Sequence, residues 1–356
     1  MKNEKKRESN FELLRIISMI MIIAHHMILH SNLIYYNDYG IKKIIVSFVL
    51  YGGKIGVILF ILISGYYMVD SKFKINKLLK LWLEIFFYSV GIEVFFIVIM
   101  KKEISINNII NAFIPISNNS YWFMTSYFAT YLISPFINKI IKSNNQDKNK
   151  KLITIWFVIL SLPMILIKKG FYNETLFFCW IYSVGAYIKT YDIKIFKNKK
   201  NFWYIILFNN IFLMVIVILM GYLSSKNTIA LKGITHFSSI NSIPMLINAF
   251  AIFERFKEIK LRYNKIILSL ASNSLAVYLI HDNYNFQNLL WNNIIDFKKL
   301  YENQFWILLL CIVGLPVIIY LICYIIEEIR KYIFDKFNIN IPNKISIKIN
   351  KIINFE

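Results

Sequence analysis

The sequence has little charge and few cysteines. Only 17% of its 356 residues are charged, against 57% that are hydrophobic, and the mean hydropathy is +0.53. This composition is far too apolar for a soluble domain, and several runs of about 18 or more apolar residues indicate a polytopic membrane protein instead. The three cysteines, Cys179, Cys311 and Cys323, all lie inside apolar runs. We therefore expect them to be small buried hydrophobes, and we expect neither a disulfide framework nor a metal site.

We find no sign in the sequence of a cleavable leader, an internal repeat or a second domain. The first apolar run is too long for the core of a signal peptide and lacks a small-residue cleavage site. We expect one membrane domain over residues 1–330. The basic stretch 331–356 is expected to be a cytoplasmic tail that lies on anionic lipid or is disordered.

Long apolar runs fill most of the chain, and they predict an all-α, polytopic bundle of about ten transmembrane helices. The expected spans lie near residues 11–30, 44–69, 78–100, 121–141, 152–168, 173–190, 202–223, 234–254, 266–285 and 305–329. The second span contains Tyr51-Gly52-Gly53-Lys54. This sequence predicts a break there, with part of the segment at the membrane interface.

The basic residues alternate between the two sides of this bundle. The net charge is +21, and 29 of the 41 lysines and arginines fall in the two termini and the loops on their side, against 10 in the opposite loops. This bias places both termini in the cytoplasm. Because the charge lies in loops between apolar spans, it indicates anionic lipid rather than nucleic acid as the partner.

Polar residues occur within the first span, residues 11–30, and their presence in a membrane helix requires an explanation. The sequence of this span is FELLRIISMIMIIAHHMILH. A charge at the centre of a membrane helix costs about 2.5–3.5 kcal/mol, and less near an end. Arg15 and His26 are eleven residues apart, so they lie within about 20° of one helical face and roughly 16 Å apart along it. His25 points about 100° away from His26. The alternatives are a snorkelling anchor for Arg15 and an interhelical hydrogen bond for His26.

An arginine, ten residues and a histidine in the first span resemble the acyltransferase-3 family of integral membrane O-acyltransferases. Three more segments resemble the same family, namely LISGYYM, YWFMTSYFATYLISPFIN and SNSLAVYLIH, at residues 62–68, 121–138 and 272–281. The similarity covers roughly residues 11–330. It implies a plasma-membrane enzyme, most simply bacterial, that moves an acyl group from cytoplasmic acyl-coenzyme A to a hydroxyl of a cell-surface glycan or lipid-linked sugar. Acetyl is the expected acyl group.

The resemblance also implies roles for residues on the donor side. His26 is expected to be a general base or to carry the acyl group itself. Arg15 is expected to bind the phosphates of coenzyme A, because a guanidinium matches phosphate oxygens. Lys77 and Lys80 stand where the family has two arginines three residues apart, so they are further donor-binding candidates. Ordinary positive-inside charge is the alternative for these lysines. Acetyl-coenzyme A is expected as a substrate, with no permanently bound cofactor.

Aromatic residues at the start of the fourth span are candidates for acceptor binding. Trp122 and Tyr127 can stack on a sugar ring, or they can belong to an aromatic belt at the membrane interface. The resemblance favours a place in the acceptor pocket for Trp122.

His281 and Asp282 end the ninth span on the outer side, and His26 lies in the outer half of the first span. We expect His26 and His281 to converge at one cavity and to act in catalysis. Asp282 is expected to contact the substrate or to orient a histidine, as carboxylates do in catalytic sites. The other acids that can partner His26 are Glu84, Glu93 and Glu254.

Two other functions remain open on the sequence alone. A transporter or flippase of a lipid-linked oligosaccharide would share the basic loops, the aromatic belts and the polar cluster. Inverted repeats would favour it, and we find none. A structural scaffold gives no reason for Arg15 and His26 to share a helical face.

Overall fold

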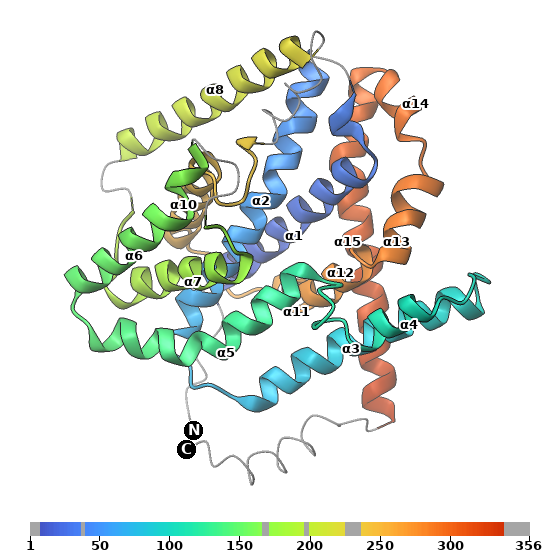
Figure 1. The fold of residues 1–356 in the computed structure, drawn as a ribbon, viewed down its shortest axis with the longest axis horizontal. Coiled ribbons are helices and arrows are strands. Elements are labelled where there is room, and N and C mark those ends of the chain that lie inside the picture. The colour runs from blue at the N-terminus through green and yellow to red at the C-terminus, as the bar shows by residue number, and fades with distance from the viewer. Residues whose placement is uncertain (1–7, 37–39, 166–170, 196–198, 225–235, 338–356) are drawn as a thin grey trace.

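The computed structural model describes residues 8–36, 40–165, 171–195, 199–224 and 236–337, and every regular element in these ranges is a helix (Figure 1). In chain order they are α1 (Ser9–His30), η1 (Leu33–Tyr35), α2 (Ile41–Met68), α3 (Ile75–Val98), α4 (Ile106–Phe113), α5 (Trp122–Ser143), α6 (Gln146–Leu160), η2 (Leu162–Ile165), α7 (Glu174–Thr190), α8 (Lys199–Ser224), α10 (Ile243–Glu258), α11 (Lys265–Ser272), α12 (Ser274–His281), α13 (Tyr284–Asn288), the π-helical turn η4 (Leu289–Asn293), α14 (Phe297–Glu302) and α15 (Phe305–Lys336). The predicted all-α class is confirmed for these ranges. Most of the expected basic tail and the basic residues before residue 8 lie outside the described residues.

Among the described residues, five helices are long and apolar enough to cross a membrane: α1, α2, α3, Phe202–Leu223 of α8, and α15. The 22 residues of α1 extend about 33 Å, which matches a hydrocarbon core of about 30 Å. Most residues of α8 and α15 are not buried within the protein. Their exposed side chains are large and apolar, for example Trp203, Phe208 and Leu310. Lipid suits such a surface, whereas water does not.

Each of the ten expected spans falls on one or two helices, but the count of ten stays a prediction. The expected span 152–168 is helical only as α6 and the short turn η2 within the described residues. The expected span 266–285 forms two helices of eight residues each, α11 and α12, which meet at Asn273. Asn273 donates a hydrogen bond to Glu328 of α15 at 2.7 Å, and this contact ties the join to the neighbouring helix. The short helices α4 and α14 lie where the sequence analysis expected loops, and α13 begins within the last two residues of the expected span 266–285.

The expected break in the second span is wrong, because α2 is one continuous helix from Ile41 to Met68. Its glycines have a packing role instead. A Cβ on Gly53 would lie 2.2 Å from the Cβ of His25, so only glycine allows α1 and α2 to approach this closely. Small residues commonly serve this purpose between membrane helices.

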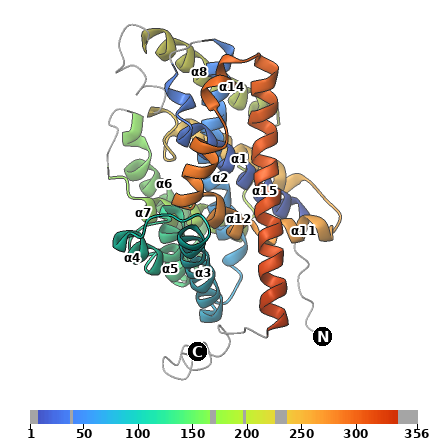
Figure 2. The same ribbon diagram turned by 90° about the vertical axis from the view of Figure 1, so that its right-hand side faces the viewer.

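The helices α1 and α2 lie in the middle of the described bundle, with α15 on one side and α5, α6 and α7 on the other (Figure 1). Figure 2 shows α15 running along the length of the molecule on the side that faces the viewer. The two central helices are antiparallel. The ring of Phe11 at the start of α1 stacks on Tyr66 at the end of α2, with centroids 5.2 Å apart, whereas His25 near the end of α1 meets Gly53. The molecule therefore has an end marked by Arg15 and an end marked by His26.

Candidate active site

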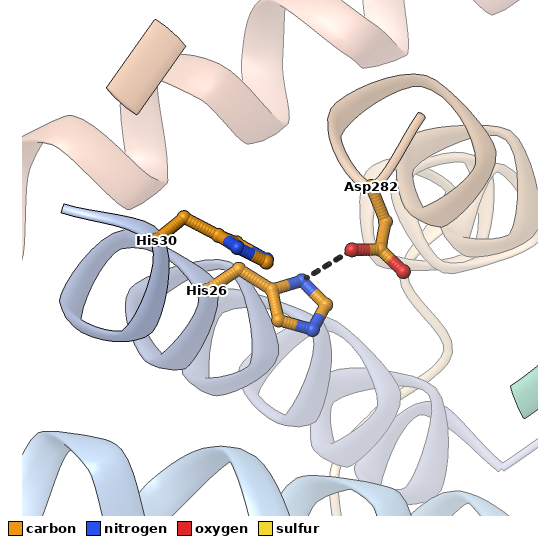
Figure 3. Close-up of side chains that lie close together, drawn as sticks. All are labelled: His26, His30 and Asp282. Carbon is orange, nitrogen blue, oxygen red and sulfur yellow. Dashed lines mark ion pairs between the residues drawn. The ribbon is translucent and has the colours of Figure 1, made fainter. Parts of the chain in front are cut away.

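The last turns of α1 carry three histidines that point in two directions. His26 faces α12: its Nδ1 lies 3.2 Å from Oδ1 of Asp282 and 3.1 Å from Nε2 of His281. His30 follows His26 by four residues, so it lies on the same helical face, and Figure 3 shows both rings beside Asp282. His25 faces α2 instead, with its Nδ1 2.6 Å from the carbonyl oxygen of Leu50. The rings of His26 and His281 therefore lie together, as expected.

Hydrogen bonding in this cluster fixes where the protons sit. Nδ1 of His281 lies 2.6 Å from the carbonyl oxygen of Val277, which can only accept, so this nitrogen carries the hydrogen. Nε2 of a neutral His281 is then an acceptor. The Asp282 carboxylate is an acceptor as well, so the shared Nδ1 of His26 is the donor to both. A neutral His26 with a hydrogen on Nδ1 keeps the lone pair on Nε2, which is the form that a general base requires.

Asp282 is itself held in place. The side-chain nitrogen of Gln287 donates to its Oδ1 at 2.7 Å and to its backbone oxygen at 3.0 Å. The other acids considered for His26 have different surroundings. Glu93 pairs with Lys102 at 2.9 Å, and Glu254 lies 3.8 Å from Lys257. Among the described residues, Asp282 is thus the acid in contact with His26.

The cluster opens into a cavity of about 250 Å³. Its walls come from α1, α2, the start of α5 with the segment before it, and the segment that follows α12. They are formed by Ile22, His25, His26, Leu29, His30, Gly53, Lys54, Val57, Asn119, Ser120, Trp122, Asp282 and Gln287. His281 is fully buried and is absent from this lining. His281 is therefore placed to position His26, and its expected catalytic role stays a prediction.

A second cavity of about 460 Å³ adjoins the first and shares His25, Leu29, Lys54 and Trp122 with it. Its remaining walls carry aromatic and hydroxyl groups, among them Tyr172 and Ser239. Trp122 thus lies in the wall between two chambers, as a residue that contacts an acceptor would. Tyr127 is placed elsewhere: its hydroxyl lies 3.3 Å from the hydroxyl of Ser64 on α2, and it lines neither chamber.

The donor-side candidates lie at the opposite end of α1. This helix is unbroken from Ser9 to His30, so Arg15 and His26 share a face, as the sequence predicts. The Arg15 guanidinium lies 2.9 and 3.1 Å from the two carboxylate oxygens of Glu12. Lys77 and Lys80 are exposed in the first two turns of α3.

A basic cleft of about 290 Å³ lies at the same end, between the end of α2 and α5. Lys72, Lys139 and Lys142 contribute its charge, and Ser71 and Asn138 contribute further hydrogen-bonding groups. The sequence analysis counted these lysines only as positive-inside charge. Their convergence depends on how α2 packs against α5, which spacing along the chain does not reveal.

The sequence model of the acyltransferase-3 family, described as an acyltransferase domain, matches residues 8–325. The chain belongs to this family. No curated protein and no solved structure matches it. Because the match covers nearly the whole chain, the enzyme is an acyltransferase, and its apolar helices make it a membrane acyltransferase. Nothing supports the transporter or flippase alternative.

The sequence analysis of the acyltransferase gave too little weight to Lys54. It treated this residue only as part of a break in α2. In the structure Lys54 lines both chambers, and its ammonium nitrogen lies 5.9 Å from the centroid of the Trp122 ring. A charged residue inside a membrane-length apolar run is functional by default, and that signal was present in the sequence.

Proposed function

We propose that this acyltransferase moves an acyl group, acetyl in the first instance, from acyl-coenzyme A to a hydroxyl of a cell-surface glycan or lipid-linked sugar. The observation that carries the proposal is the surroundings of His26. Its Nδ1 lies within 3.2 Å of Asp282, and its ring lines the 250 Å³ cavity. A buried histidine oriented by a carboxylate and open to a cavity is the arrangement that general-base acyl transfer requires.

In the proposed reaction Nε2 of His26 takes the proton from the acceptor hydroxyl. The hydroxyl oxygen attacks the thioester carbonyl carbon and forms the new ester bond. The carbon–sulfur bond breaks, and the coenzyme A thiolate leaves and takes up the proton from His26. Asp282 stabilises the imidazolium while it exists, because their separation is that of an ion pair. Lys54, in the cavity wall, is suited to stabilise the negative charge that develops on the carbonyl oxygen.

We assign the donor's phosphates to the Arg15 end of the bundle. Arg15, Lys77 and Lys80 supply charge there, and the basic cleft of Lys72, Lys139 and Lys142 supplies more. Arg15 and His26 are separated by roughly 16 Å along α1, a length that the pantetheine arm of coenzyme A can bridge. The acceptor sugar is assigned to the 460 Å³ chamber beyond Trp122, where aromatic faces and hydroxyls suit a sugar ring.

Mass spectrometry of surface glycans from cells with and without the gene tests this function. We expect an acyl-sized mass on a glycan hydroxyl that is lost with the gene and regained with the wild-type chain. Identical glycan masses in the two strains, with the protein present in the membrane, would contradict the proposal. The mass difference also identifies the acyl group, because acetyl and succinyl differ in mass.

The proposed orientation places both termini and the Arg15 end in the cytoplasm, where acyl-coenzyme A is made. Its support is the bias of 29 basic residues against 10. Reporters fused after Lys148, Lys199 and Glu258 should be cytoplasmic, and those after Asn118 and Lys299 should be external. An external signal at Lys199 would refute the arrangement with ten spans.

A further inference from the structure

The same cluster has a property that acyl transfer does not use. We propose that His26, His30 and Asp282 form a binding site for a divalent transition-metal ion of the Zn²⁺ type. One donor atom from each of these residues lies within 4.8 Å of the other two (Figure 3). Two histidines four residues apart present their rings on one face of a helix, and this spacing is used by zinc enzymes.

The distances fit a tetrahedral metal centre. Zinc binds nitrogen at about 2.0–2.1 Å and carboxylate oxygen at about 2.0–2.2 Å, which separates neighbouring donor atoms by about 3.3 Å. His26 Nδ1 and Asp282 Oδ1 already lie 3.2 Å apart. His30 has at most about 1.5 Å to move, and a small rotation of its side chain supplies that. His281 Nε2, 3.1 Å from His26 Nδ1, offers a further lone pair at the same point.

The residues behind the cluster match the outer shell of a metal site. Ligating histidines usually donate their second nitrogen to a carbonyl, and ligating carboxylates are hydrogen-bonded in turn. His281 donates to the Val277 carbonyl at 2.6 Å, and Gln287 donates to Asp282 at 2.7 Å. His26, His30 and Asp282 all line the 250 Å³ cavity, so an ion there has an open side for water or another small ligand.

The donor set selects the class of ion. Imidazole nitrogens with one carboxylate suit Zn²⁺ and its first-row neighbours, whereas Mg²⁺ and Ca²⁺ require oxygen ligands. The sequence analysis expected no metal site because the cysteines are few and scattered. The proposed site uses histidines, and its third ligand, Asp282, directly follows α12, more than 250 residues away along the chain.

Metal binding and acyl transfer compete for the ring of His26, although they use different nitrogens of it. Coordination through His26 Nδ1 moves the hydrogen of the neutral ring to Nε2, and this nitrogen can then no longer accept a proton. Zn²⁺ should therefore inhibit transfer, and a chelator should restore it. This consequence rests on the proposed function, whereas the binding site itself does not.

The test of the site uses untagged protein in detergent, titrated with Zn²⁺ or with Co²⁺ as a visible probe. We expect one equivalent to bind, with Co²⁺ giving the absorption bands of a tetrahedral centre. His30→Ala, His30→Gln and Asp282→Asn should each weaken binding at least about 100-fold, since even outer-shell changes cost 10–100-fold. His25→Ala is the matched control, because His25 faces Leu50, and this variant should bind as wild type. Absence of binding above a detergent blank, or equal affinity in His30→Ala, would overturn the proposal.

Inhibition is measured as the ratio of transfer rates with and without Zn²⁺ within each variant, so a change in basal rate does not matter. The wild type should be inhibited, and His30→Ala should be inhibited far less at the same Zn²⁺ concentration. If Zn²⁺ binds at the site but leaves transfer unchanged, the metal site stands and the role of His26 as base fails. If no metal binds, the acyl-transfer proposal is unaffected.

Discussion

The two ends of α1 hold their polar residues in different ways. At the end of the helix His26 is buried, and its Nδ1 is shared between His281 and Asp282, which are themselves held by Val277 and Gln287. At the start of the helix Arg15 has a quarter of its side chain exposed and pairs with Glu12 within its own helix. The lysines proposed for donor binding at that end are also exposed, namely Lys72, Lys77, Lys80, Lys139 and Lys142.

This difference suggests two kinds of binding. A buried hydrogen-bonded network has one arrangement, so removing a member leaves other groups unsatisfied and has a large effect. Exposed charges act mostly through the summed field at the surface, and each of them matters little. We therefore expect substitutions at the His26 end to affect the chemical step strongly. At the Arg15 end we expect graded, salt-sensitive effects on donor binding.

The largest effect is expected for His26→Ala. Loss of a general base typically reduces the rate by about 10²–10⁴-fold, while insertion in the membrane and binding of coenzyme A should persist. His25→Ala is the neighbouring control and should retain measurable transfer, because His25 Nδ1 is occupied by the Leu50 carbonyl. A glycan acylation assay on the purified variants measures both. If both variants fold and lose transfer activity equally, His26 cannot be assigned as the base in preference to His25.

The next largest effect is expected for Asp282→Asn. This change removes a charged partner of His26 worth about 1.5–3 kcal/mol, which corresponds to roughly a 10- to 150-fold lower rate at unchanged donor affinity. Asp296→Asn is the matched control, since Asp296 caps α14 by accepting a hydrogen bond from the Lys299 amide. Both rates and coenzyme A affinities should be measured. A normal rate in Asp282→Asn would show that the carboxylate charge does not assist His26.

The sequence predicted the fold well where a single helix carries the information. Apolar run length located α1 and α3 to within about three residues, and it located the start of α15, which continues to Lys336, beyond the expected end at residue 329. It failed at Gly52-Gly53, which were expected to break α2. Gly53 is needed because His25 on the facing helix lies against it, and that partner is invisible in a local pattern. The sequence also did not predict that the ninth span divides into α11 and α12 at Asn273. The hydrogen bond from Asn273 to Glu328 of α15 stabilises this join.

The sequence predicted the site only in part, as it did the fold. Helical phase placed Arg15 and His26 on one face, and the positions of His26 and His281 in the outer halves of their spans indicated their convergence. The choice of Asp282 over Glu93 as the acid beside His26 depends on how α12 packs against α1, a contact between residues about 250 positions apart. Lys54 shows a different limit. Its charge in an apolar run was visible, but its two cavities appear only once α1, α2 and α5 are packed together.

A moderate effect is expected for Arg15→Ala. Because Arg15 is partly exposed and shared with Glu12, loss of its phosphate contact should cost about 1.5 kcal/mol, near the lower limit for a charged hydrogen bond. This is about a tenfold weaker affinity for coenzyme A. Arg15→Lys should recover only part, since lysine lacks the guanidinium fork. The control is Arg255→Ala, which removes an exposed arginine that also pairs three residues along its helix, with Glu258. Unchanged affinity in Arg15→Ala would make Arg15 an anchor.

The smallest effect is expected at Lys77 and Lys80. An exposed ion contact contributes about 0.2–1 kcal/mol, so each change to glutamine should weaken coenzyme A binding by no more than about fivefold. The double variant should lose more, and the loss should shrink as salt rises, because salt screens exposed charges. Lys148 and Lys151 are the matched pair: they are also exposed and three residues apart, on α6, and their double variant should bind as wild type. Affinity measured at low and high salt decides between the possibilities. A large loss that salt does not alter would mean that one of these lysines contacts a phosphate directly, and the contrast between the two ends of α1 would then be weaker than the structure suggests.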